Sequence, residues 1–163
     1  MTGMDVVNEE DKLKRYIEAH NIKCEHLRFD NPVHTAEEAA NATGAPVGLI
    51  TKSVIFRDAN GATVVGLVPA GFRVSVSKLE SASARSGLVL TDSDETYKRT
   101  GYPAGGVPCF GYEALFVMDP LVEQNDCIYT GGGSEYSLLK ITVADVLRLA
   151  NPMTGKKIRG SKT

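Results

Sequence analysis

Residues 53–68, Ser-Val-Ile-Phe-Arg-Asp-Ala-Asn-Gly-Ala-Thr-Val-Val-Gly-Leu-Val, decide the fold class of this chain. Two runs rich in β-branched and aromatic residues, 53–57 and 63–68, flank a turn in which Asn60-Gly61 supplies the positive φ angles of a tight hairpin. A hairpin is antiparallel, whereas the rest of the chain interleaves strands and helices. The sheet is therefore expected to be mixed, which excludes a doubly wound parallel sheet.

The helices around this hairpin are predicted from capping residues. Thr35 with Glu38, and Ser77 with Glu80, have the spacing of a capping box, in which each side chain binds a backbone N–H of the other residue. Asn8 is a candidate N-cap for the first helix. The expected helices are 8–21, 35–44, 77–86, 92–100 and 142–151, and the further strands are 22–29, 88–90, 114–118, 127–129 and 138–141.

The composition indicates one globular domain. With 163 residues, 42% of them hydrophobic and 23% charged, the chain is long enough to bury a sizeable core. Its apolar runs are too short to cross a membrane, so no membrane partner is expected. Cys24, Cys109 and Cys127 form no C-x-x-C pair, which indicates reduced thiols and a cytoplasmic location. His20, Cys24 and His26 have no second cluster to complete four ligands, so no metal is expected.

The net charge of −2 gives no broad basic surface for DNA. The exception is the last stretch, where Lys156, Lys157, Arg159 and Lys162 lie close together. We expect residues 153–163 to form a basic, flexible tail that follows a single domain at 1–152. Two interpretations of this tail remain open: a solvated chain end, or a loose electrostatic contact for RNA phosphates.

Residues 101–111, Gly-Tyr-Pro-Ala-Gly-Gly-Val-Pro-Cys-Phe-Gly, form a loop that contains four glycines and two prolines. Such a segment is neither an ordinary helix nor a central strand. Glycine lets backbone N–H groups approach a ligand closely, and proline keeps the loop stiff. The composition suits the wall of a small polar site, although a purely structural turn has the same composition.

Two further segments accompany this loop. Lys52 stands at the head of the apolar run 53–56, where an exposed lysine at the start of an edge strand is the plainest interpretation. A second glycine cluster, Gly131-Gly132-Gly133, follows a short apolar run. No Gly-Lys-Ser/Thr follows this cluster, and a strand rather than a helix comes next, so a nucleotide-hydrolysing phosphate loop is excluded.

Together with His34-Thr35-Ala36-Glu37-Glu38-Ala39-Ala40, these segments resemble the YbaK/prolyl-tRNA-synthetase editing-domain family of aminoacyl-tRNA deacylases. The resemblance spans about residues 22–150. It implies an α/β fold with a strongly curved, barrel-like mixed sheet surrounded by helices. It also implies an enzyme without a cofactor, whose substrate is the 3′ acceptor end of aminoacyl-tRNA.

The resemblance assigns roles to particular residues. Lys52 would bind the phosphate of the terminal adenosine or the ester carbonyl, and Gly105 matches the first glycine of the family's Gly-x-x-x-Pro loop. The fifth position of that pattern is Cys109 here, with the proline displaced to Pro108, which alters the wall that faces the aminoacyl group. Catalytic roles fall to Lys52 and Gly105, and the substrate-binding residues implied are His34, Thr51, Ser53, Gly101, Tyr102, Gly106, Val107, Pro108, Cys109, Gly131, Gly132, Gly133 and Ser134.

The N–H groups of Gly105, Gly106 or Val107 are candidates to stabilise the oxyanion of ester hydrolysis. A nucleophilic Cys109 is the weaker interpretation, because all three histidines precede residue 35 in no recognisable protease arrangement.

The function implied is hydrolysis, in trans, of mischarged tRNA-Pro that carries alanine, cysteine or serine, with prolyl-tRNA synthetase as a partner. A non-catalytic module that binds aminoacyl or nucleotide groups, and a general hydrolase of small esters, remain the alternatives.

Overall fold

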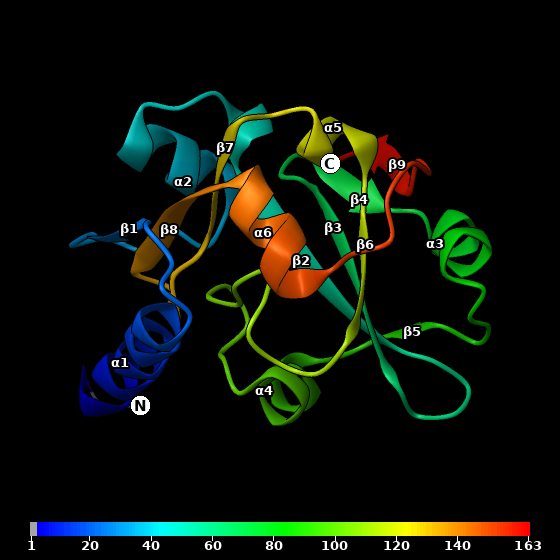
Figure 1. The fold of residues 1–163 in the computed structure, drawn as a ribbon, viewed down its shortest axis with the longest axis horizontal. Coiled ribbons are helices and arrows are strands. Elements are labelled where there is room, and N and C mark those ends of the chain that lie inside the picture. Colours follow the sequence, from blue (N-terminus) through cyan, green and yellow to red (C-terminus); the bar gives the residue numbers. More distant parts are fainter. Residues whose placement is uncertain (1–2) are drawn as a thin grey trace.

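The computed structural model describes residues 3–163, and its strands form three sheets. The four-stranded sheet has the order β5-β2-β3-β6, the three-stranded sheet has the order β1-β8-β7, and β4 pairs with β9 (Figure 1). The strands are β1 (Glu25–Arg28), β2 (Thr51–Arg57), β3 (Thr63–Pro69), β4 (Phe72–Val74), β5 (Val89–Leu90), β6 (Leu115–Met118), β7 (Cys127–Gly131), β8 (Ser137–Thr142) and β9 (Arg159–Lys162).

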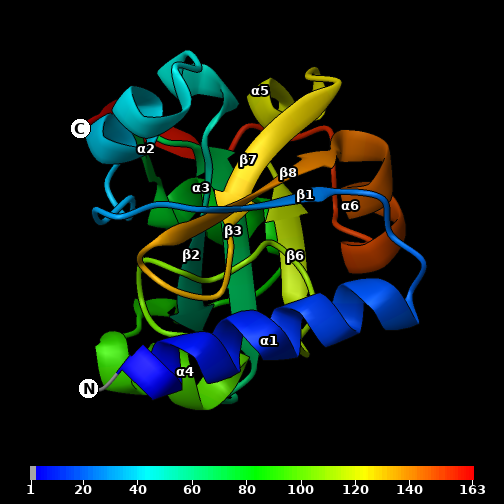
Figure 2. The ribbon, with the colours of Figure 1, turned by 90° about the vertical axis from the view of Figure 1, so that its left-hand side faces the viewer.

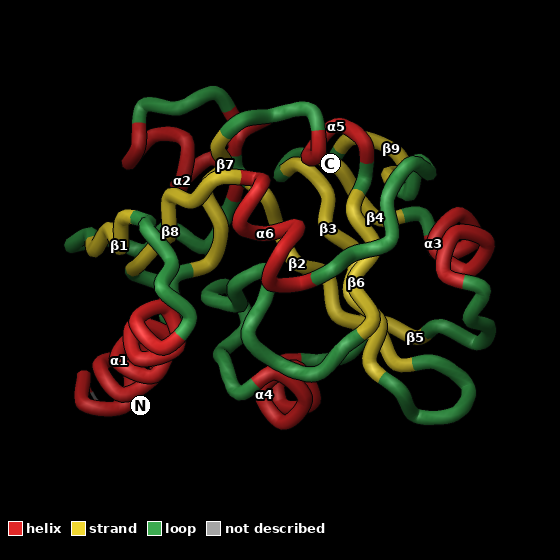
Figure 3. Tube along the Cα trace, in the orientation of Figure 1, coloured by secondary structure: helices red, strands yellow, loops and turns green. Residues whose placement is uncertain are grey.

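The helices lie around these sheets. They are α1 (Gly3–Ala19), α2 (Ala36–Thr43), the 3-10 turn η1 (Val47–Leu49), α3 (Val76–Ser83), α4 (Ser93–Thr100), α5 (Pro120–Glu123) and α6 (Val143–Ala150). Figure 2 shows α1 along one end of the molecule, with α2 and α5 at the opposite end. Between α4 and β6 the chain forms a long loop, drawn in green in Figure 3, and this loop contains the first glycine cluster. Within residues 3–163, no helix has both the length and the apolarity to span a membrane.

The hairpin that decides the fold class is confirmed. Thr51 lies opposite Pro69 and Arg57 lies opposite Thr63 in the antiparallel pair of β2 and β3, whereas β3 and β6 run parallel. The four-stranded sheet is therefore mixed, as predicted. In the turn, the expected positive φ angle is found at Gly61 (84°) but not at Asn60. The Asp58 carboxylate orders the turn instead, because its Oδ1 accepts the N–H groups of Asn60 and Ala62.

The barrel-like sheet is not confirmed, because none of the sheets formed by residues 3–163 closes on itself. The two larger sheets meet at the start of β2, where Ile50 forms a parallel bridge with Tyr129 of β7. Beyond this bridge, the outer edge of β2 lies close to β7 but forms no continuous hydrogen-bonded ladder with it.

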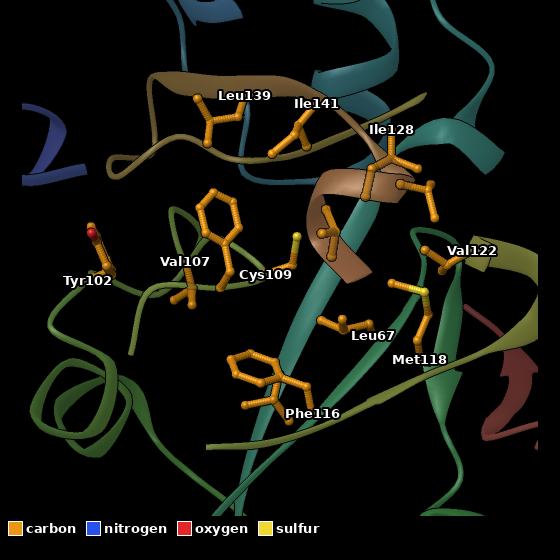
Figure 4. Packing of buried hydrophobic residues seen from close by; sticks show 14 of the residues in the cluster. Leu67, Tyr102, Val107, Cys109, Phe116, Met118, Val122, Ile128, Leu139 and Ile141 are labelled. Atoms are coloured by element: carbon orange, nitrogen blue, oxygen red, sulfur yellow. The ribbon is translucent and has the colours of Figure 1, made fainter. Parts of the chain in front are cut away.

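Alternate residues of β2 and β3 enter two separate cores. Ile55 and Leu67 face the main core, which also includes Phe110, Ile128 and Leu139 and is shown in part in Figure 4. The side chains that alternate with these, Phe56 of β2 and Val64 and Val68 of β3, face a second core, which α3 covers. The other buried members of this second core are Leu79, Ala82, Leu88, Val117 and Ile158, and Val54 packs against it. Because side chains alternate along a strand, Lys52 shares the face of Val54, and Ser53 shares the face of Ile55.

Several predicted helix caps are confirmed. Thr35 and Glu38 form the reciprocal capping box, Asp92 caps α4, and Thr142 caps α6. Two cap predictions are wrong. Helix α1 begins before Asn8, and the N-cap of α3 is Ser75 rather than Ser77. Glu80, the expected partner of Ser77, instead accepts the backbone N–H of Leu88.

The expectation of a flexible tail at residues 153–163 is wrong, because strand β9 pairs with β4 and Ile158 is fully buried. The fully buried Asp119 holds this segment: its carboxylate accepts the N–H groups of Ile158 and Arg159 and forms an ion pair of 2.7 Å with the Arg159 guanidinium. Burial alone would raise the pKa of Asp119, but these hydrogen bonds and that of Leu121 N–H lower the pKa. Arg159 is thus paired within the protein, whereas Lys156, Lys157 and Lys162 are exposed.

This packing predicts a large stability difference between neighbouring tail residues. Truncation of Ile158 to alanine removes buried methyl groups, so the free energy of unfolding should fall by about 2–5 kcal/mol. The exposed neighbour Lys157 is the matched control, and Lys157→Ala should change the same quantity by less than about 0.5 kcal/mol. Urea denaturation of both variants measures the difference, and equal stabilities would contradict the packed tail.

Candidate active site

A cavity of about 420 Å³ opens along the outer edge of β2. Seven of the residues predicted for the site line it: His34, Thr51, Lys52, Ser53, Gly105, Val107 and Gly131. Several other lining residues were not predicted from the sequence, including Ala70, Gly71, Leu90, Thr91, Thr96 and Thr163. Those residues come from four separate segments and carry no motif, so only the tertiary fold brings them to the cavity.

The outer edge of β2 is paired at both ends and open between them. At its start Ile50 bridges to β7, and at its end Phe56 and Arg57 pair with β5. The Ile55 carbonyl accepts the backbone N–H (3.0 Å) and the hydroxyl (2.9 Å) of Thr91, so the polar backbone groups of Ile55 point away from β3. Ser53, two residues earlier, presents its N–H and C=O on the same side. The open stretch of β2 therefore offers the cavity a donor and an acceptor from one residue.

Lys52 is half-buried in the cavity and has no carboxylate within ion-pair distance among the side chains of residues 8–163. Burial lowers its pKa, and the exposed Arg73 of β4 lowers that pKa further by charge repulsion. Both effects disfavour a charged ammonium in the free protein. A bound anion would oppose both, so the surroundings of Lys52 suit a negatively charged or carbonyl-bearing ligand.

Thr51 adds an unused polar group to the same wall. The residue is 3% exposed, and its Oγ1 finds no hydrogen-bond partner in the described part of the chain. A buried hydroxyl without a partner costs about 1–3 kcal/mol. A polar ligand in the cavity is one way to recover that cost.

The two glycine clusters pack against each other, backbone to backbone. The Gly133 N–H donates to the Gly106 carbonyl over 2.9 Å. A Cβ atom on Gly106 would lie 2.7 Å from backbone atoms of Ser134, and a Cβ on Gly131 would overlap the Val107 carbonyl. These glycines therefore permit close contact between two protein loops, rather than close approach to a ligand as the sequence had indicated.

Gly105 is the glycine that faces the cavity. Its φ of 87° favours glycine, and a Cβ there would lie 2.6 Å from the His34 Cβ. The Gly106 N–H donates to the Pro103 carbonyl (2.9 Å), which removes it from the predicted oxyanion donors. Gly105 and Val107 remain as candidates, since both line the cavity.

His34 connects the start of α2 with the second glycine loop at the cavity rim. Its Nδ1 lies 3.4 Å from a carboxylate oxygen of Glu135, and its Nε2 lies 3.9 Å from one of Glu38. The side chain is 41% exposed, so these ion pairs are weak contributors to stability. The Cβ of His34 packs on Gly105, so this histidine also fixes where the Gly105 loop lies.

The structure does not bring the other predicted residues to the cavity wall, namely Gly101, Tyr102, Gly106, Pro108, Cys109, Gly132, Gly133 and Ser134. Tyr102 and Cys109 belong to the main core, as Figure 4 shows. Burial raises the pKa of each to about 12. Cys109 therefore holds a protonated thiol with no exposure, which excludes it as a nucleophile.

The remaining members of that group support the loops. Gly101 ends α4 with a φ of 80°, and the Pro108 carbonyl accepts the Tyr112 hydroxyl (2.8 Å). The Ser134 hydroxyl donates to the buried Glu10 carboxylate (2.6 Å), which ties the second glycine loop to α1. As for metals, the side chains of residues 8–163 include no group of three His, Cys, Asp or Glu placed to hold an ion.

Residues 30–149 match the family of aminoacyl-tRNA editing domains. The chain therefore belongs to this family, and the match includes the whole open stretch of β2 and both glycine clusters. The strand β9 and the whole of α1 lie outside the matched residues.

Known proteins similar to the chain agree with this assignment. A proline–tRNA ligase from Fervidobacterium nodosum is 28% identical over 113 residues, which are 68% of this chain and 20% of the ligase. The chain thus spans about one fifth of that relative. Two solved structures share the fold: the hypothetical protein APE2540 (TM-score 0.83, 24% identity, 91% of this chain and 99% of that one), and a candidate trans-editing enzyme for prolyl tRNA synthetase (TM-score 0.82, 23% identity, 94% and 98%).

The contact between the glycine loops predicts that Gly106→Ala is disruptive. The new Cβ would press on the Ser134 backbone, so the free energy of unfolding should fall by about 1–3 kcal/mol and the cavity wall should shift. Gly48 is the matched control, because it is exposed and a Cβ there meets nothing within 4 Å. Gly48→Ala should leave the thermal midpoint unchanged or raise it. Thermal unfolding of both variants measures this, and an equally stable Gly106→Ala protein would refute the packing argument.

Proposed function

We propose that this protein is a deacylase that hydrolyses the ester bond of mischarged aminoacyl-tRNA in trans. One observation carries the proposal: the editing-family segment 30–149 surrounds a cavity in which Lys52 lies without a counter-ion beside the open edge of β2. An ester at the end of an RNA brings both a carbonyl and nearby phosphates, which are the groups that such a cation binds.

The reaction is an ester hydrolysis. The oxygen of a water molecule adds to the carbonyl carbon, the bond between that carbon and the ribose oxygen breaks, and the ribose oxygen leaves with a proton that the water gave up. Negative charge develops on the carbonyl oxygen. Lys52 and the N–H groups of Gly105 or Val107 stabilise this charge, and a well-aimed donor contributes about 3–4 kcal/mol.

The cavity contains few acid–base side chains, and this fits the proposed substrate. An aminoacyl ester is already activated, so positioning and electrostatic stabilisation supply most of the catalysis. The only thiol in the glycine loop, that of Cys109, is buried and protonated, which supports direct attack by water over a covalent intermediate. Cys109, the residue at which this loop differs from the family pattern, is buried in the core. The cavity wall is formed instead by Gly105 and Val107.

The substrate proposed is tRNA-Pro that carries alanine, cysteine or serine. The proline context rests on the similarity to a proline–tRNA ligase and to a candidate trans-editing enzyme for prolyl tRNA synthetase. The proposed preference for a small amino acid rests on the stiff cavity wall that Val107 and the backbone of Gly105 and Gly131 provide. Prolyl-tRNA synthetase is the proposed partner, because that enzyme releases the mischarged tRNA that this site would hydrolyse.

The central test of Lys52 is Lys52→Met, which keeps the length of the side chain and removes its charge. Single-turnover deacylation of alanyl-tRNA-Pro should slow at least tenfold, equivalent to about 1.4 kcal/mol of barrier. Because the folded protein lowers the pKa of Lys52, the charged form costs stability at neutral pH, and the variant should melt at the same or a higher temperature. Activity within twofold of wild type would reject the role of Lys52, and Lys52→Arg serves as the charge-retaining control.

The cavity wall predicts graded selectivity among aminoacyl groups. Alanyl-, seryl- and cysteinyl-tRNA should be hydrolysed faster than leucyl- or phenylalanyl-tRNA, with alanine first. Since one methylene discriminates by only about 1–3 kcal/mol, differences among the three small substrates should be modest. A deacylation panel on tRNA-Pro measures the order, and fastest hydrolysis of a large aminoacyl group would overturn this part of the proposal.

A further inference from the structure

The open stretch of β2 has the size of a single residue. It lies between the bridge of Ile50 to β7 and the pairing of Phe56 with β5, so a peptide strand could enter only by displacing one of these neighbours. Thr51, Ser53 and Ile55 direct their backbone groups outward here, and Ser53 lies midway between the bridge at Ile50 and the Ile55 carbonyl that Thr91 occupies. In an antiparallel sheet the N–H and C=O of such a residue bind the N–H and C=O of one opposite residue.

We propose that the aminoacyl group of the substrate binds here as a one-residue strand, antiparallel to β2. Its α-ammonium donates to the Ser53 carbonyl, and the Ser53 N–H donates to the ester carbonyl oxygen. An α-amino ester contains the same N–Cα–C=O unit as a residue in a strand, which is why it fits this pair of groups. This inference rests on the proposed deacylase function and names the groups that hold its substrate.

The antiparallel direction of the bound aminoacyl group agrees with the positions of the other residues that line the cavity. A residue that exchanges both hydrogen bonds with Ser53 must run opposite to β2, so its ester end points toward the start of that strand. Lys52, Gly71 and Thr163 line the cavity at that end, which places the ammonium of Lys52 near the ribose and its phosphates. The unpartnered Thr51 hydroxyl also lies toward the start of β2, but on the face of Ser53 and Ile55, opposite to Lys52.

The side chain of the bound aminoacyl group also has a defined direction. Residues that lie opposite each other in a sheet project their side chains to the same face. Ser53 shares its face with Ile55, which enters the main core beside Val107. The bound side chain would therefore point at the wall formed by Val107 and the Gly105 loop, which accounts for a limit on its size.

The first test changes the substrate. Lactyl-tRNA carries a hydroxyl in place of the α-ammonium of alanyl-tRNA and is otherwise matched in size. The kcat/KM for lactyl-tRNA should be at least tenfold lower than that for alanyl-tRNA after each is divided by its uncatalysed rate of hydrolysis, because a charged hydrogen bond to the Ser53 carbonyl is lost. Equal normalised rates would overturn the inference.

The second test changes the protein backbone. Incorporation of the α-hydroxy analogue of serine at position 53 replaces the Lys52–Ser53 amide by an ester, which removes the Ser53 N–H and makes the Lys52 carbonyl a weaker acceptor toward β3. Deacylation of alanyl-tRNA should slow at least tenfold, while protein prepared by the same route with ordinary serine at position 53 should match the wild type. The Ser53 N–H points away from β3, so the ester variant should keep its thermal midpoint within a few degrees.

The two tests separate this inference from the proposed function. If wild-type protein hydrolyses alanyl-tRNA but the ester variant does so equally fast, the inference fails and the deacylase function stands. A loss with lactyl-tRNA alone would place the α-ammonium elsewhere, for example at Glu135, and would also overturn it. If wild-type protein hydrolyses no aminoacyl-tRNA, both fail. Should the ester variant not fold, equal normalised rates for lactyl- and alanyl-tRNA on wild-type protein would still overturn the inference.

Discussion

Direct backbone contact between the two glycine clusters is the constraint on which the site depends. The hydrogen bond from Gly133 to Gly106, and the absence of side chains at Gly106 and Gly131, allow the loop before β6 to lie against the end of β7. That contact brings Gly105 and Val107 to the open edge of β2. Any side chain between the loops would move the wall away from Ser53, so the glycines act on the site indirectly.

The chain end contributes to the same architecture through a buried charge. Asp119 orders residues 158 and 159, and β9 then pairs with β4, which follows the cavity-lining turn at Ala70 and Gly71. Thr163 donates its backbone N–H to the Gly71 carbonyl (2.8 Å) and itself lines the cavity. A segment that reads as a solvated basic tail is thus part of the wall, and removal of the Arg159 partner would leave the Asp119 carboxylate buried without its counter-ion.

Local signals in the sequence predicted the helices and strands, whereas contacts between distant segments could not be predicted from it. The hairpin and the Thr35 capping box each follow from a few adjacent residues, whereas the role expected of Lys52 came only from the family resemblance. The pairing of β9 with β4 does not follow from adjacent residues. The four residues of β9 include two cations and carry no strand signal, and their position depends on Asp119, some 40 positions away. The sequence indicated that both glycine clusters are important. It could not show which surface each glycine approaches, because that surface belongs to a loop distant in the sequence. Ser53 was included as a binding residue, yet the interruption of the β2 edge that exposes its backbone arises only from the placement of β5 and β7.

A structure with a non-hydrolysable substrate analogue tests the central claim most directly. 3′-Alanylamino-3′-deoxyadenosine replaces the ester by an amide and keeps the amino group, the carbonyl and the ribose. The account predicts that its amino group lies within hydrogen-bond distance of the Ser53 carbonyl, with the alanyl methyl toward Val107 and the ribose beside Lys52. An analogue bound away from the edge of β2, or bound there with its amino group in solvent, would contradict the account.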